Sequence, residues 1–87
     1  MENIIVIVFT DKEQAEKANK IFNNLSSIET ELATKFKFRQ IAANKWEYRY
    51  DTYNDGYGID KDKDEFEDMV DRLVRRNEIK TEWYLNE

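Results

Sequence analysis

The chain of 87 residues contains no cysteine and no histidine. Without cysteine it can form no disulfide, no zinc–thiolate site and no thiol nucleophile. Without histidine it lacks the commonest general base, the commonest metal ligand and the usual switch near neutral pH. No pocket for a paired-carboxylate mechanism is specified by the sequence either, so we expect no enzyme activity and no cofactor.

Proline is also absent, and only two glycines are present. No segment resembles a flexible linker and none repeats, so the sequence predicts a single domain over residues 1–87. Hydrophobic residues make up 40% of the chain, which suffices for a small core. No basic segment precedes the first apolar run, so we expect no signal peptide, no membrane association and a cytoplasmic location.

The longest apolar run is Ile4-Ile5-Val6-Ile7-Val8-Phe9, and most of its residues are β-branched. It is far shorter than the roughly 20 residues that a transmembrane helix needs. A short, uncharged, β-branched run is typical of a strand that is buried on both faces. We therefore predict that it forms the central strand of a sheet.

Two helices are predicted from apolar spacing. Thr10 and Glu13 match a capping box, and the helical pattern after them predicts a helix from Asp11 to about Asn24. A second helix, ended by Asn77, is indicated by an apolar stripe at Phe66, Met69, Val70, Leu73 and Val74. The segment Ile28–Ala33 fits either a further helical turn or a loop.

Three more strands complete the expected fold. Alternating residues in Thr34–Ala42 and Trp46–Asp51 predict a hairpin across Ala43-Asn44-Lys45, and Ile79–Leu85 predicts a last strand. The order β-α-β-β-α-β indicates an α+β fold of the ferredoxin-like type, with a four-stranded antiparallel sheet and two helices on one face. That architecture hosts many functions, so it does not select one.

The charge is concentrated in the second half of the chain. Residues 1–53 carry eight basic and eight acidic side chains, whereas residues 54–87 carry six basic and eleven acidic ones, a net charge of −5. An acidic cluster attracts basic surfaces and repels phosphate. The competing interpretation is a solvated helix start, because carboxylates are favourable near a helix N-terminus.

The same acids fit a calcium loop only in part. Asp60, Asp62 and Asp64 have the spacing of the first three ligands, but Glu65 occupies the position that requires glycine. A frame that begins at Asp51 has Tyr53 where an oxygen ligand should lie. We therefore predict no metal site.

Aromatic residues offer a different hypothesis, in which the open face of the sheet binds RNA by base stacking. The strand around Trp46, Tyr48 and Tyr50 lacks the glycines of the RNA-recognition signature, and the net charge is negative. We favour the interpretation that these residues and Trp83 belong to the core or cover the sheet. An aromatic surplus on the open face could equally bind a protein.

The function that the sequence favours is that of a small acidic inhibitor or modulator, bound to a larger protein with a basic surface, such as one that normally holds nucleic acid. In size, acidity and lack of catalytic motifs, the chain resembles small phage-encoded inhibitors, including anti-CRISPR proteins, some of which mimic the charge of DNA. That resemblance implies a location in the host cytoplasm. The expected contact residues are two tyrosines and seven acids: Tyr53, Asp55, Tyr57, Asp60, Asp62, Asp64, Glu65, Glu67 and Asp68.

The alternative is a ligand-sensing or structural module that pairs its open sheet face with a second copy. A monomer in solution would favour the inhibitor, and a dimer would favour the module. We expect no direct contact with nucleic acid.

Overall fold

The computed structural model describes residues 2–51 and 61–86. In chain order the elements are β1 (Glu2–Phe9), α1 (Lys12–Phe22), α2 (Ser27–Lys35), β2 (Arg39–Ala42), β3 (Lys45–Asp51), α3 (Lys61–Arg76) and β4 (Thr81–Asn86). The strands form one sheet in the order β2-β3-β1-β4, and every neighbouring pair is antiparallel. The predicted α+β fold with a four-stranded antiparallel sheet is therefore confirmed.

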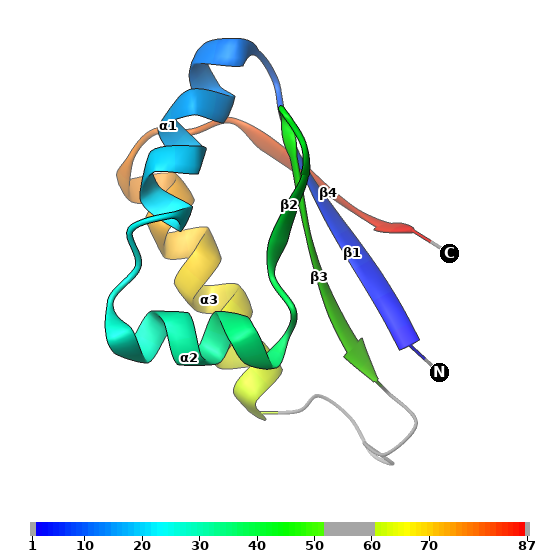
Figure 1. Ribbon diagram of the computed structural model, residues 1–87. Coiled ribbons are helices and arrows are strands. Elements are labelled where there is room, and N and C mark those ends of the chain that lie inside the picture. Colours follow the sequence, from blue (N-terminus) through cyan, green and yellow to red (C-terminus); the bar gives the residue numbers. More distant parts are fainter. Residues whose placement is uncertain (1, 52–60, 87) are drawn as a thin grey trace.

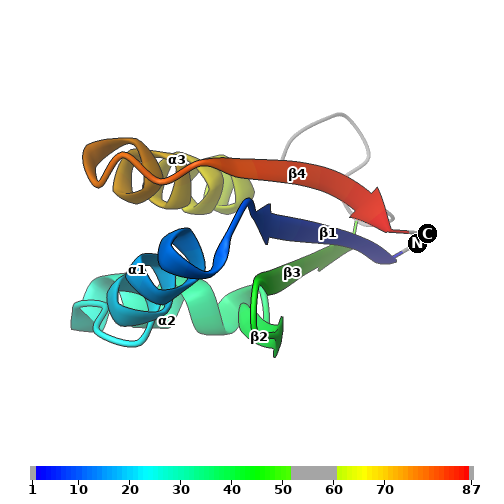
Figure 2. The ribbon, with the colours of Figure 1, turned by 90° about the horizontal axis from the view of Figure 1, so that it is seen from above.

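All three helices lie on one side of the sheet, and the other side is open (Figure 1). Seen from above, α3 lies on the β4 side of the molecule, while α1 and α2 lie on the β2 side (Figure 2). Among the described residues, no helix combines the length and apolar character needed to cross a membrane.

The strand β1 occupies the centre of the sheet, as the apolar run predicts. Ile7 and Phe9 belong to the core beneath the helices. Val6 points to the open face, where it pairs with Glu47 on one side and Tyr84 on the other, yet it is only 1% exposed. Burial on both faces explains why this strand carries no charge between Ile4 and Phe9.

The helix-facing side of the sheet is covered by packed aromatic rings. The Trp46 ring lies 5.1 Å from that of Phe22 and 4.8 Å from that of Phe38, measured between centroids. The Tyr48 ring lies 5.1 Å from that of Phe66. Such pairs each contribute about 0.5–1.5 kcal/mol beyond the area they bury. The core interpretation of Trp46 and Tyr48 is confirmed, and Tyr50 and Trp83 pack against the same cluster.

The expected two helices are in fact three, because the ambiguous segment Ile28–Ala33 lies within α2. Ser26 and Glu29 form a complete capping box, in which Glu29 N donates to Ser26 Oγ (3.3 Å) and Ser26 N donates to Glu29 Oε1 (2.9 Å). The apolar pattern of this helix is weak because Ile28 faces solvent, with 79% of its surface exposed. The cap, rather than the pattern, therefore defines the helix.

The strand predicted at Thr34–Ala42 is wrong in its first half. Phe36 caps the end of α2, and Lys37 follows in the left-handed region with a φ of 52°. Lys37 N donates to Thr34 O (3.1 Å) and Phe38 N to Ala33 O (3.0 Å), the two bonds of a Schellman motif. Phe36 and Phe38 thus reach the core from a helix end, and the strand begins only at Arg39.

The cap of α1 also differs from the prediction. Asp11, not Thr10, is the N-cap, and its carboxylate accepts a hydrogen bond from Gln14 N at 2.9 Å. A carboxylate at this position is also stabilised by the helix dipole, an advantage that the Thr10 hydroxyl lacks. The predicted end of α3 is confirmed, because Asn77 N and Nδ2 both donate to Leu73 O.

Candidate protein-binding surface

Of the predicted contact residues, some lie in the part of the chain that the structure describes and the others lie outside it. Tyr53, Asp55, Tyr57 and Asp60 lie outside the described residues. The other five are Asp62, Asp64, Glu65, Glu67 and Asp68, and all of them belong to the first half of α3. The apolar stripe of α3 faces the core, so these acids lie along its sides and its outer face.

Glu67 is used by the fold. The buried hydroxyl of Tyr48 donates a hydrogen bond to Glu67 Oε2, and Lys63 Nζ donates to Oε1 at 2.8 Å. Burial and the bond to Glu67 raise the pKa of Tyr48, so that this hydroxyl stays protonated and donates. Glu67 is therefore an anchor between α3 and β3, and it is a poor candidate for a partner contact.

Asp62 is also committed within the chain. Its carboxylate forms an ion pair with Lys35, the last residue of α2, and so links the end of α2 to the start of α3. Both side chains are about half exposed, so this pair contributes little to stability. The pair nevertheless reduces the charge that Asp62 offers to a partner.

Three acids remain exposed. Asp64, Glu65 and Asp68 form no hydrogen bond or ion pair with other described residues, and all three face solvent. Asp68 follows Glu65 by three residues and Asp64 by four, so it is a neighbour of both on the helix surface. We call these three residues the acidic strip.

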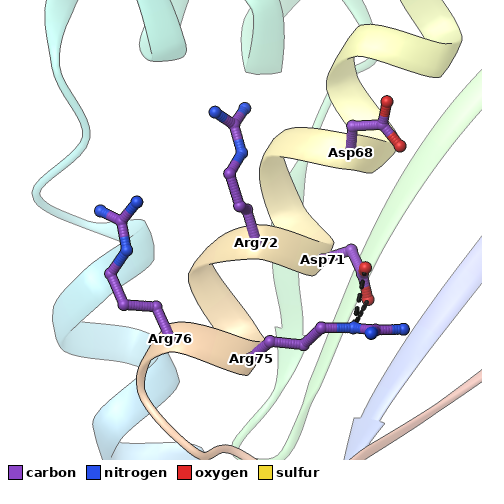
Figure 3. Close-up of a pocket in the computed structure, with 5 residues that line it drawn as sticks. All are labelled: Asp68, Asp71, Arg72, Arg75 and Arg76. Carbon is purple, nitrogen blue, oxygen red and sulfur yellow. Dashed lines mark hydrogen bonds and ion pairs between the residues drawn. The ribbon is translucent and has the colours of Figure 1, made fainter.

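The second half of α3 is basic on its outer face. Figure 3 shows Arg75 paired with Asp71, at 3.0 Å, while Arg72 and Arg76 point away from that pair. These residues and Asp68 line an open hollow of about 760 Å³. Hydrogen bonds from Ser26, and then the charges of Arg72 and Arg76, lower the pKa of Glu29 on α2. The basic segment is visible in the sequence, but basic residues at a helix end are already explained by the helix dipole, so they do not by themselves indicate a site.

The open face of the sheet carries a row of charges across three strands. Glu47 Oε1 accepts from Arg39 Nε (2.8 Å) and from Arg49 Nη2 (3.1 Å), and Arg49 Nη1 donates to Glu2 Oε1 (2.9 Å). Glu47 is only 4% exposed. Burial opposes its ionisation, but the bonds from the two arginines outweigh burial and lower its pKa. Opposite charges on β2 and β3 thus pair across the hairpin.

This face offers little for base stacking. Trp46, Tyr48 and Tyr50 point to the helices, and Tyr84 is the exposed aromatic residue of the described chain. The described residues also contain no group of three carboxylates that could hold a metal ion. Asp60, the first residue of one partial calcium frame, lies outside the described residues.

The geometry therefore singles out the acidic strip on α3 and the charged row on the sheet. A comparison with protein families finds no matching family model, and a comparison with curated proteins finds no matching relative.

Proposed function

We propose that the chain is a non-enzymatic protein that binds a larger partner through a basic surface of that partner, as an inhibitor or modulator. The observation that carries this proposal is the acidic strip, whose three carboxylates are exposed, adjacent and unused within the described fold. The strand order, with β1 between β3 and β4, supports a ferredoxin-like plan to which α2 is added.

Helix stability accounts for only one of the three acids in the acidic strip. The helix dipole favours carboxylates only within the first turn, which ends at Asp64. Glu65 and Asp68 lie beyond it, and like charges at i,i+3 or i,i+4 cost about 0.2–0.5 kcal/mol per pair. A binding role would explain why these charges are retained, and the competing explanation is solubility.

The basic end of α3 limits what kind of partner fits. Arg72 follows Asp68 by four residues, a rise of about 6 Å along the helix. A broad basic groove that holds nucleic acid would meet repulsion from Arg72, Arg75 and Arg76. We therefore propose a small basic patch as the target, opposite the first half of α3.

Charge reversal tests this proposal directly. The variant Asp64→Lys, Glu65→Lys, Asp68→Lys should remain folded but associate more slowly with a partner captured from the native host by the wild type. The control is Glu16→Lys, Glu31→Lys, Glu82→Lys, which makes the same change in net charge at exposed positions outside α3. Association of the wild type should slow with added salt.

Equal association rates for the two triple variants would show that the acidic strip is only a solvated face. Asp62 and Glu67 are not suitable for this test, because their reversal would break contacts within the fold.

The alternative function, a ligand-sensing or structural oligomer module, would use the open face. Tyr84 is 45% exposed there, and the same face carries charges of both signs on the neighbouring strands. Sedimentation of the wild type distinguishes the two functions, since the module requires a dimer and the inhibitor does not.

A further inference from the structure

A second surface, which shares no residue with the acidic strip, carries several positive charges. It is a pocket of about 520 Å³ where the end of α2 meets β2 and β3, lined by Thr34, Lys37, Phe38, Arg39 and Arg49. Every charged residue that lines it, within the described part of the chain, is cationic. Residues 1–53, which contain all of them, carry equal numbers of basic and acidic side chains, so composition alone does not explain this grouping.

The cations come from three different elements that the fold brings together. The Schellman turn after α2 places Lys37, and Arg49 N donates to Phe36 O at 2.7 Å, which holds this turn against β3. Arg39 begins β2, opposite Glu47. The backbone therefore fixes the three positions relative to one another.

Glu47 also orients the two arginines. Because Arg39 and Arg49 donate to the same carboxylate oxygen, their guanidinium groups converge. Two acids lie next to these cations: Glu47, which is buried, and Glu2, which pairs with Arg49. The three cations and the two acids together carry one net positive charge. Arg39 uses only its Nε in the described contacts, and Lys37 forms no ion pair with a described residue.

We infer that this pocket binds a small phosphate monoester. A monoester carries a charge of about −1.5 to −2 and three acceptor oxygens at neutral pH, which suits convergent guanidinium and ammonium donors. The ring of Phe38 provides an apolar wall for the organic group of the ester. The volume of the pocket lies within the range of about 300–1,000 Å³ found for small-molecule sites.

The inference goes beyond the proposed function, because it uses no residue of the acidic strip. It is tested by titrating the ¹⁵N-labelled protein with phenyl phosphate and with inorganic phosphate at pH 7.5. The amides of Lys37, Arg39 and Arg49 should shift saturably, and phenyl phosphate should bind more tightly than inorganic phosphate.

Two variants probe the donors, and one serves as a control. Lys37→Gly suits the left-handed φ of 52° and removes the ammonium group, and Arg39→Gln removes a guanidinium. Each lost charge-assisted bond is worth about 1.5–3 kcal/mol, so each variant should raise the Kd for phenyl phosphate at least about tenfold. Lys17→Gln, at an exposed site on α1, should leave the Kd unchanged.

The inference is overturned if about 10 mM phenyl phosphate, ten times the Kd of a weak millimolar site, causes no saturable shift. An equal loss of affinity in Lys17→Gln would also overturn it, because binding would then follow net charge alone. The inference is also overturned if a single-stranded oligonucleotide binds and phenyl phosphate does not. That result would show that the surface binds the backbone of a nucleic acid and not a small monoester.

Discussion

Replacing Glu67 with alanine removes the acceptor of the Tyr48 hydroxyl. Tyr48 is 0% exposed, and Glu67 is the acceptor of its hydroxyl among the described residues. A buried donor left without an acceptor costs about 1–3 kcal/mol. The variant also loses the i,i+4 pair with Lys63, worth about 0.3–0.5 kcal/mol.

We therefore expect Glu67→Ala to lower the free energy of unfolding by about 1.3–3.5 kcal/mol, the sum of these two losses. The matched substitution Glu65→Ala should change it by less than about 0.5 kcal/mol, because Glu65 is exposed and forms no hydrogen bond or ion pair with another described residue. Tyr48→Phe should cost about 1 kcal/mol, since Glu67 keeps Lys63 as a partner. The double variant should lose less than the sum of the single losses, because no hydroxyl is then left without an acceptor.

Urea denaturation followed by the fluorescence of Trp46 and Trp83 measures the wild type and all four variants, because both indoles lie in or against the core. Equal small losses in Glu67→Ala and Glu65→Ala would show that Glu67 does not hold the Tyr48 hydroxyl. Additive losses in the double variant would show that Tyr48 and Glu67 do not interact.

Three further predictions concern local structure. Glu78→Gly should raise the free energy of unfolding by up to about 1 kcal/mol: the left-handed conformation costs a non-glycine residue about 1–2 kcal/mol, and the greater unfolded-state freedom of glycine offsets about half of that gain. Glu78 has a φ of 57°, in the left-handed region. Glu78→Ala should leave stability unchanged because alanine keeps the Cβ atom, so equal effects of the two substitutions would contradict this prediction. Asp11→Ala should cost about 1 kcal/mol through loss of the cap and Thr10→Ala much less, whereas the reverse order in thermal melts would reassign the cap to Thr10. Since the folded pKa of Glu47 is below its ordinary value of 4.5, its stabilisation is complete above that value and is lost as the pH falls through the lowered pKa. The wild type should thus lose more stability than Glu47→Gln as the pH falls below about 5, and parallel acid titrations of stability would contradict this.

Some elements could be predicted because a long pattern reports burial residue by residue. The apolar run of β1 predicts a central strand, and the stripe of α3 predicts a helix with its buried face. The alternation in β3 correctly assigns Trp46 and Tyr48 to the core and Glu47 to the opposite face. In each case a local period fixes which side of the element meets the core.

Other features were decided by contacts between distant segments. Phe36 and Phe38 alternate as in a strand, but both reach the core from the end of α2, so their spacing alone could not reveal the turn. The distinction between Asp64 and Glu67 depends on Tyr48, which lies 19 residues before Glu67.

The sheet, its central strand, the helix α3 and the acidic excess can therefore be predicted from local patterns in the sequence. Which acids are exposed, and where the cations converge, depends on tertiary contacts. Composition and spacing record how many charges a segment carries and which helix face they share, but an ion pair requires atoms from two elements to meet. Such meetings depend on the packing of the whole chain, as the convergence of Lys37, Arg39 and Arg49 at one pocket illustrates.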